Sequence, residues 1–488
     1  MQPKGIDMKM ERNKEIIGRE YEQRQLEECL ESDSAQFVAV YGRRRVGKTF
    51  LVKKFFADRF DFYVSGVYGI SMKEQLDVFA DQLSQYSRRN IERPENWFEA
   101  FRLLRDYLGS LQKDKWVVFI DELPWFDTPK SNFIRALEAF WNMWGSDHKQ
   151  LLLIVCGSAT TWMINTLLGD KGGLHNRVTR RIHLYPFNLG ETEEYLLSKG
   201  IDWDRLHILQ CYMTVGGIPY YLSLIKKEES MMQNTDRLFF GRDAILRDEY
   251  NFVFKSLFND SVAYRRVLEL LATKMSGYTR NDIISDLRIT GNGTLTEILN
   301  NLCACDFITP YSTFGKRSND IVYKLSDHYL LFYLRFVKNY LGKNPKAWSE
   351  MKDQARSTWY GYAFEQVCLY HVWQIKESLG IRGIDSSVSS WSYKAKSPEE
   401  KGAQIDLVIQ RADRMINLCE IKFSTKPYEI TADYSQQLSY RKELFRTKTK
   451  CRDTLLTTVI TTFGVARNKY SNYVQSEIVL DDLFRKER

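Results

Sequence analysis

The sequence predicts a multidomain α/β protein, and two stretches far apart in the chain carry this prediction. Near the N-terminus, a glycine-bearing loop at residues 42–49 joins a short apolar run to an apolar pattern of helical spacing, which is typical of a sheet covered by helices. Near the C-terminus, two β-like runs at residues 404–409 and 417–422 carry embedded acids. The chain has 488 residues, too many for one hydrophobic core. About two to four domains are therefore expected.

The composition is that of an ordinary water-exposed globular protein, with 44% hydrophobic and 27% charged residues and a net charge of +8. No apolar run approaches the roughly 18 residues that a membrane helix needs. The first ten residues lack the apolar core of a signal peptide, so we expect a cytoplasmic protein with no membrane partner. The eight cysteines include no C-x-x-C pair, which argues against a zinc site and a disulfide framework.

The loop at residues 42–49 matches the phosphate-binding pattern G-x-x-x-x-G-K-[ST] in full. A strand-like run at 37–41 precedes it and a helical pattern at 50–56 follows, so a chance glycine loop is a poor alternative. Loop N–H groups and the helix N-terminus would hold phosphate, Lys48 would reach the β- and γ-oxygens, and Thr49 would bind Mg²⁺. The residues predicted to bind ATP here are Gly42, Arg43, Arg44, Arg45, Val46, Gly47, Lys48, Thr49 and Phe50.

A second motif follows at the end of a later strand. After a strand at 62–64 and helices near 71–86 and 97–111, an apolar run at 116–120 ends in Asp121 and Glu122. Asp121 would hold Mg²⁺ opposite Thr49, and Glu122 would polarise a water for attack on the γ-phosphate. The alternative is a strand that merely ends in solvent-facing acids. The adjacent glutamate and the strand between the two motifs favour the additional-strand class of P-loop ATPases over a kinase arrangement.

Three further residues are candidates for the nucleotide site. A helix near 132–144 and a strand at 151–156 lead to Ser158, which either senses the γ-phosphate or belongs to a Gly-Ser turn. Arg177 lies in a glycine-bearing loop before a predicted fifth strand at 180–187, and either contacts phosphate during catalysis or is simply solvated. Residues 190–240 read as helices, and Pro219 starts one of them where a lid could touch the nucleotide.

The third region, residues 246–337, has a winged-helix pattern of helices near 263–272, 279–287 and 293–302 and two wing strands. Such folds bind DNA through the second helix of their helix-turn-helix. Here that helix uses Leu295, Ile298, Leu299 and Leu302 as core positions, and its remaining residues include no lysine or arginine. A structural role between domains is therefore as well supported as base recognition.

The last region carries acids in the pattern of a metal-dependent nuclease. Asp406 lies on one β-like run, Glu420 and Lys422 on the next, and Glu365 on a preceding helix. The carboxylates would hold Mg²⁺ and Lys422 would orient a water. Because three carboxylates would crowd together, at least one should have a raised pKa. The alternative is a hairpin whose acids and lysine face solvent.

Two features of a following helix bear on this site. Gln436 or Gln437 could support the carboxylates. A basic stretch is either a solvated face or a phosphate-binding one, and comprises Arg441, Lys442, Arg446, Lys448, Lys450 and Arg452.

Taken together, these motifs resemble the archaeal-type ATPases of the signal-transduction ATPase (STAND) branch, relatives of AAA+ proteins. Members couple a P-loop domain to a winged helix and a C-terminal restriction-endonuclease-like domain. The resemblance covers nearly the full chain and implies that Arg19 lies on the adenine side, Ser158 near the γ-phosphate and residues 217–219 near the base. One departure is Ile405, which stands where the PD-(D/E)xK pattern has proline before the acid, here Asp406.

The expected domains are a P-loop ATPase core at 12–190, a helical lid at 191–245, a winged helix at 246–340 and a restriction-endonuclease-like domain at 357–488. The expected activity is ATP hydrolysis with ATP and Mg²⁺, by a molecular switch whose nuclease-like domain acts on or binds DNA or another nucleic acid. The alternative is a STAND-type signalling ATPase with a protein-binding output and a catalytically silent nuclease-like domain. Both functions are compatible with a homo-oligomer.

Overall fold

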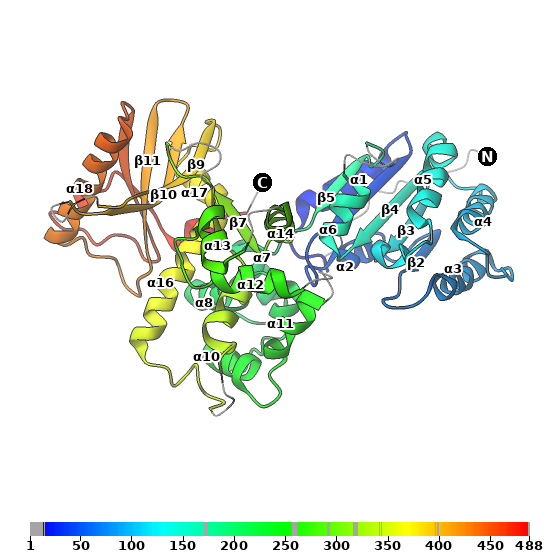
Figure 1. Ribbon diagram of the computed structural model, residues 1–488, viewed down its shortest axis with the longest axis horizontal. Coiled ribbons are helices and arrows are strands. Elements are labelled where there is room, and N and C mark those ends of the chain that lie inside the picture. Colours follow the sequence, from blue (N-terminus) through cyan, green and yellow to red (C-terminus); the bar gives the residue numbers. More distant parts are fainter. Residues whose placement is uncertain are drawn as a thin grey trace, which may run out of the picture. The chain divides into compact units, whose positions relative to one another are not determined.

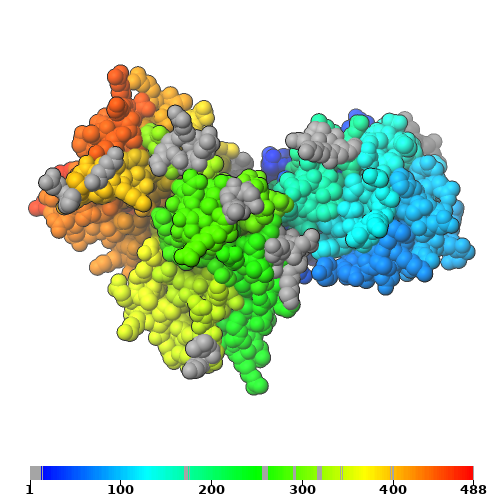
Figure 2. All heavy atoms as spheres, viewed as in Figure 1, coloured from blue at the N-terminus to red at the C-terminus, as the bar shows by residue number. Residues whose placement is uncertain are grey.

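The computed structural model describes residues 13, 15–169, 174, 176–255, 261–289, 293–315, 321–340, 342, 344–395, 397 and 400–486. The chain divides into two compact units, one ending at Tyr185 and one beginning at Pro186. The first is blue to cyan and the second green to red in Figure 1 and Figure 2. The predicted start of the ATPase core, residue 12, lies outside the described residues.

The first unit is built on a five-stranded parallel sheet, as the sequence predicts. Its order is β2-β3-β4-β1-β5, so β4 lies between the strand before the glycine loop and the strand that ends in Asp121. The strands are β1 Gln36–Tyr41, β2 Phe62–Ser65, β3 Trp116–Asp121, β4 Leu151–Gly157 and β5 Arg180–His183. The predicted fifth strand extended to residue 187. It ends earlier because its partner β1 ends at Tyr41, which lies opposite His183.

The strands and helices of this unit follow from simple sequence patterns. Every residue of β3 and β4 is buried, as expected for continuous apolar strands covered on both faces. A capping box of Ser71 and Glu74 starts α3, which satisfies backbone donors at the helix N-terminus. The helices are α1 Glu20–Glu31, α2 Lys48–Phe55, α3 Met72–Ser87, α4 Trp97–Gly109, α5 Phe133–Met143 and α6 Thr160–Trp162, with short segments η1 Leu123–Phe126, η2 Gly145–Asp147 and η3 Met163–Leu167.

The second unit begins with a helical region. Its elements are α7 Leu189–Ser198, α8 Arg205–Val215, α9 Pro219–Leu222, α10 Met231–Thr235, η4 Asp236–Phe240 and α11 Ile245–Lys255, joined later by α15 His328–Phe332 and η5 Tyr333–Val337. The approach of two chain segments explains one glycine. A Cβ on Gly217 would lie 1.9 Å from the carbonyl oxygen of Phe187, whose N–H donates to the Gly217 carbonyl at 2.7 Å.

A small three-stranded antiparallel sheet with helices follows. The elements are α12 Ser261–Leu271, β6 Tyr278–Thr279, α13 Arg280–Leu287, α14 Gly293–Ala304, β7 Ile308–Tyr311 and β8 Val322–Leu325, and the sheet order is β6-β8-β7. The predicted core residues of α14 are buried, and Thr294, Thr296, Glu297 and Asn300 are exposed. The predicted turn residues Gly291 and Asn292 lie outside the described residues.

The C-terminal part holds a mixed five-stranded sheet of order β13-β12-β11-β10-β9. Strands β9, β10 and β11 pair antiparallel, whereas β11, β12 and β13 pair parallel. The elements are α16 Asp353–Tyr370, α17 Val372–Ser378, β9 Ser386–Tyr393, β10 Ala403–Arg411, β11 Met415–Lys422, α18 Ala432–Thr449, β12 Thr454–Thr461, η6 Ser471–Tyr473, β13 Ser476–Ile478 and α19 Leu480–Leu483. Helix α16 packs against β11, and α18 packs against β10 and β12. None of the helices in the described ranges is long and apolar enough to cross a membrane.

Two histidines are buried in the core of the second unit, near Tyr212. The rings of His328 and His371 lie 5.2 and 5.6 Å from the ring of Tyr212. Burial lowers the pKa of His328 to about 3, with a contribution from His371, and burial lowers the pKa of His371 to about 4. His371 accepts a hydrogen bond from the Leu189 N–H at 2.9 Å, whereas neither ring nitrogen of His328 has a partner within the described part of the chain.

We therefore expect the second unit to lose stability as the pH falls. An unfolded histidine takes up a proton below about pH 6.5, while these folded ones stay neutral until about pH 4 and 3. The free energy of unfolding should fall by about 1.4 kcal/mol per pH unit for each histidine in that window. His328→Phe, which breaks no hydrogen bond, should remove about half of this slope in urea unfolding between pH 7.5 and 5. A slope identical to that of the native chain would contradict the assignment.

Candidate functional site

The glycine loop between β1 and α2 has a backbone that only glycine accepts at two positions. Gly42 and Gly47 have φ angles of +138° and +94°. A Cβ on Gly42 would lie 2.4 Å from the carbonyl oxygen of Leu184. A side chain at either position would strain the loop, because L-residues rarely adopt these angles. The sequence pattern of the loop is thus tied to its shape.

The two motifs predicted for the nucleotide site meet in the structure. Lys48 is buried, and its ammonium donates to the carbonyl oxygens of Gly42 and Arg43 at 2.8 and 2.9 Å. The hydroxyl of Thr49 donates to Oδ2 of Asp121 at 2.8 Å. A hydroxyl and a carboxylate are the hard oxygen ligands that Mg²⁺ prefers, so this pair fits the ion of Mg·ATP. When bound, the ion would neutralise charge on the phosphates.

Glu122 is held in an uncommon backbone conformation beside this pair. Its φ and ψ are +46° and +45°, in the left-handed region, which costs a non-glycine residue about 1 kcal/mol. Oδ1 of Asp121 accepts the Glu122 N–H at 2.9 Å. Oε2 of Glu122 accepts the hydroxyl of Ser158 at 2.8 Å and the Ser158 N–H at 3.2 Å. The carboxylate of Glu122 is thereby fixed at the edge of the sheet where β3 and β4 end.

The other predicted nucleotide residues take different positions. Arg43 and Val46 are buried, Arg45 is half-buried, and Arg44 and Phe50 are exposed. Arg19 is buried before α1, and its guanidinium donates to the carbonyl oxygen of Val46 at 3.4 Å, so it contacts the loop.

The roles assigned to these residues stay predictions, as do those of Arg177 and Pro219. Arg177 is exposed, in a loop whose Gly172 and Gly173 lie outside the described residues. Pro219 begins α9 in the second unit.

The predicted nuclease-like residues gather in the second unit. The register pairs Leu407 with Cys419, so the next residues along, Asp406 and Glu420, lie on the same side of the sheet. Oδ2 of Asp406 accepts the N–H of Ile421 at 3.3 Å.

Burial and the charge of Asp406 raise the pKa values of the two glutamates in this cluster. Burial raises the pKa of Glu420, and the charge of Asp406 adds to that rise. Burial likewise raises the pKa of Glu365, where the Lys324 charge lowers it and Asp406 raises it further. The pKa values of both glutamates are thus raised as expected, but burial contributes more to the rise than repulsion between the carboxylates.

Two cations that the sequence did not assign to this cluster are bound to its carboxylates. The ammonium of Lys324, on β8, lies 3.1 Å from Oε1 of Glu365. The guanidinium of Arg441, on α18, forms an ion pair with Glu420, which also accepts the hydroxyl of Tyr434 at 3.4 Å. The only sequence signal for Lys324 was a lysine among apolar neighbours in a predicted strand.

These contacts correct two expectations. Arg441 is engaged with Glu420, so it is not a free member of a basic face. Gln436 and Gln437 are exposed on α18, and the α18 side chains that reach Glu420 are Tyr434 and Arg441. Across the described ranges, no group of three or more His, Cys, Asp or Glu residues is arranged to hold a metal ion.

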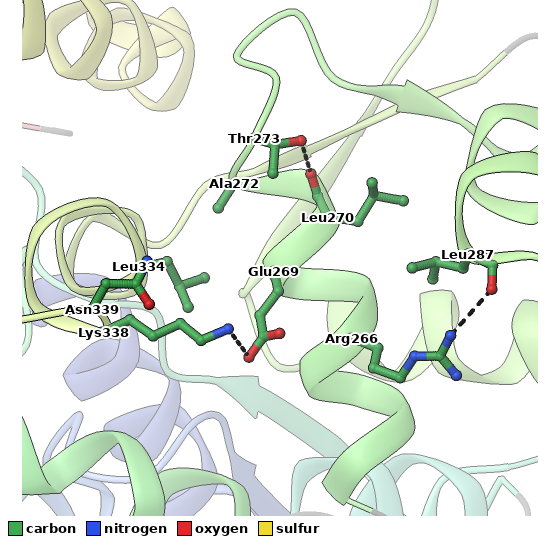
Figure 3. Close-up of a pocket in the computed structure, with 9 residues that line it drawn as sticks. All are labelled: Arg266, Glu269, Leu270, Ala272, Thr273, Leu287, Leu334, Lys338 and Asn339. Carbon is green, nitrogen blue, oxygen red and sulfur yellow. Dashed lines mark hydrogen bonds and ion pairs between the residues drawn. The ribbon is translucent and has the colours of Figure 1, made fainter.

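The second unit also contains a pocket of about 420 Å³ beside α12 and α13 (Figure 3). It is lined by Arg266, Glu269, Leu270, Ala272, Thr273, Leu287, Leu334, Lys338 and Asn339. Lys338 pairs with Glu269 at 2.7 Å, and Arg266 donates to the carbonyl oxygen of Leu287 at 3.1 Å. Its charged groups are thus engaged with one another and with backbone, and none of the predicted site residues lines it.

Comparison with known proteins agrees with the chemistry of the glycine loop. Residues 16–225 match a family model described as an ATPase domain predominantly from Archaea, so the chain contains an archaeal-type ATPase domain. An uncharacterized protein of Methanocaldococcus jannaschii is 25% identical over 414 residues, covering 84% of this chain and 87% of the relative.

Two solved structures are similar at lower identity. The Walker-type ATPase of Pyrococcus abyssi is 19% identical, with a TM-score of 0.48, over 67% of this chain and 99% of that one. A STAND protein with a tetratricopeptide repeat sensor from Pyrococcus horikoshii is 15% identical, with a TM-score of 0.31, over 73% of this chain and 45% of that one.

Ser158→Ala tests whether the hydroxyl of Ser158 contributes to hydrolysis by fixing Glu122. The change removes the 2.8 Å hydrogen bond and leaves the backbone one. We expect kcat for ATP hydrolysis to fall by about tenfold, or about 1.4 kcal/mol, with ATP binding little changed. Ser158→Thr keeps the hydroxyl and should restore most of the rate. Unchanged turnover in Ser158→Ala would show that the contact is only structural.

Proposed function

We propose that this chain is an ATP-driven molecular switch whose N-terminal unit binds and hydrolyses Mg·ATP. The observation that carries the proposal is the hydrogen bond from Thr49 to Asp121 beside the buried ammonium of Lys48. A phosphate loop and a strand-end acid are the minimum that phosphoryl transfer to water needs, because the reaction depends mainly on positioning and charge neutralisation.

Each residue of the site performs a different part of ATP binding or hydrolysis. Lys48 exchanges its loop carbonyl partners for the β- and γ-phosphate oxygens, and Thr49 and Asp121 hold the metal. Glu122 orients the attacking water, and Ser158 restrains the Glu122 carboxylate. Additional contacts proposed for the nucleotide are Arg19 and Pro219 near the base, and Arg177 at the phosphates.

Two substitutions separate binding from hydrolysis. Lys48→Ala should weaken ATP binding, because the ammonium no longer neutralises the phosphates. Glu122→Gln should retain binding and lose turnover by about 10²-fold or more, the range of general-base losses. Both are measured by equilibrium ATP binding and by phosphate release.

A matched control for Lys48 is available on the same helix. Lys54 pairs with Glu15 at the protein surface, so Lys54→Ala should change neither quantity. If Lys48→Ala bound ATP as tightly as the native chain, the assignment of the site would be wrong.

For the output of the switch, we propose that the C-terminal region is a nuclease-like domain that binds nucleic acid. The supporting observation is that Asp406 on β10 and Glu420 on β11 lie on the same side of the sheet, with Lys422 two residues after Glu420 on β11. The order of two helices, three antiparallel strands, a helix and a parallel strand also fits such a domain. The signalling alternative, with a protein partner, uses the same ATPase and leaves this domain silent.

Binding of branched, duplex and single-stranded DNA at several salt concentrations distinguishes the two outputs. Affinity for nucleic acid should fall steeply with salt, because phosphate contacts release counterions. Lys442 and Arg446 lie on α18, and Lys442→Gln with Arg446→Gln should lower the salt slope by about 2. The exposed pair Lys226→Gln and Lys227→Gln removes the same charge elsewhere and serves as the control. No binding to any of these DNAs at low salt would favour the protein-binding output.

A further inference from the structure

The carboxylate cluster of the C-terminal region is balanced by cations of the protein itself. Three acids, Glu365, Asp406 and Glu420, lie in electrostatic contact with three bases. The bases are Lys324, Lys422 and Arg441. Lys422 matches the lysine of the nuclease pattern because it follows Glu420 by two residues, whereas Lys324 and Arg441 each form an ion pair with one of the glutamates.

Lys324 is brought to this cluster by the way its sheet joins the mixed sheet. The segment after β7 pairs with β9: the Phe314 N–H donates to the Ser390 carbonyl at 2.8 Å, and the Ser390 N–H donates to the Ser312 carbonyl at 3.0 Å. The ring of Phe314 lies 4.8 Å from that of Phe445 on α18. Strand β8, which pairs with β7, is therefore held where Lys324 meets α16.

The burial of Lys324 makes its pairing with Glu365 obligatory. The Lys324 side chain is only 4% exposed and that of Glu365 16%. Taking a charge out of water is expensive unless an opposite charge compensates it. A divalent ion needs the same carboxylate oxygens and would add two positive charges beside a bound ammonium. Lys324 and a divalent metal therefore compete for Glu365.

We propose that Lys324 is a built-in counter-ion that closes the nuclease-like site to divalent metal while β8 packs against α16. Arg441 does the same at Glu420 from α18. This inference rests on the assignment of the nuclease-like site in the proposed function, and adds to it the residue that controls metal entry. It makes the metal-free cluster the stable state of this fold and predicts that removing one lysine creates a metal site.

Binding of Mn²⁺ to the nucleotide-free, full-length chain tests the proposal, with free Mn²⁺ measured by electron paramagnetic resonance. Lys324→Met keeps the length and apolar stem of the side chain, and should tighten Mn²⁺ binding by about tenfold or more through loss of the competing charge. The double variant Lys324→Met with Glu365→Gln should return to the weak binding of the native chain. This reversal separates the cluster from any Mn²⁺ bound at Asp121.

A matched control comes from another ion pair of the same unit. Lys338→Met breaks the pair with Glu269 and should leave Mn²⁺ binding unchanged. Near-ultraviolet circular dichroism checks that each variant is folded, and Lys324→Gln, which keeps a hydrogen-bond donor for Glu365, replaces Lys324→Met if that variant unfolds.

Two results would overturn the inference. Equally tight Mn²⁺ binding by the native chain and the folded lysine variant, lost in both with Glu365→Gln, would show that Lys324 does not compete. Equally weak binding by the two would show that the carboxylates do not form a metal site. Neither result depends on ATP hydrolysis or DNA binding, so failure here differs from failure of the proposed function.

Discussion

The hydrogen bond between Thr49 and Asp121 is the contact on which the N-terminal unit depends. It joins residues 72 positions apart, and it forms because β1 and β3 run parallel on either side of β4. Carboxyl ends of parallel strands meet at one edge of the sheet, which is where α/β proteins place their ligands. Register confirms the alignment, with Tyr41 of β1 opposite Gly157 of β4. At this single edge the first turn of α2 thus supplies the ammonium and the hydroxyl, and the end of β3 supplies both acids.

Close packing at this edge also fixes the strained backbone of Glu122. A Cβ on Gly66 would lie 2.6 Å from the Glu122 carbonyl oxygen, and one on Gly157 would lie 2.7 Å from Cδ of Pro124. These glycines let the chain after β3 pass between its neighbours. Hydrogen bonds to two carboxylates then stabilise the turn. The Asp121 carboxylate accepts the Glu122 N–H, and the Glu122 carboxylate accepts the N–H and the hydroxyl of Ser158. Strain of this kind persists where surrounding contacts determine the conformation, and it is concentrated at functional sites.

Local patterns were enough to predict most elements, because continuous apolar runs and capping residues act within a few positions. The parallel sheet and the start of α3 at Ser71 are examples. Which charges pair across the fold has no local signature. Lys324 and Glu365 are 41 residues apart, and Arg441 and Glu420 are 21 apart. Any of the 70 basic residues could take these places, so the sequence alone leaves Arg441 either on a solvated face or on a phosphate-binding one. No local pattern defines a role for Arg177 or Pro219 either, so their assignments rest on position alone.

The two acid clusters of the chain differ in the charge of their partners, and this difference decides what each can bind. Asp121 accepts hydrogen bonds from neutral donors, the Thr49 hydroxyl and the Glu122 N–H, so its negative charge is still available to a cation. Glu365 and Glu420 are paired with an ammonium and a guanidinium, which already neutralise them. Removing one partner of a buried ion pair leaves the other partner with an uncompensated charge. A carboxylate in that state would be stabilised by another cation, such as a metal ion. A carboxylate is therefore proposed as a metal ligand beside the glycine loop, whereas in the mixed sheet carboxylates each form half of an ion pair. The two sites differ in whether a lysine or arginine of the protein already forms an ion pair with the carboxylate.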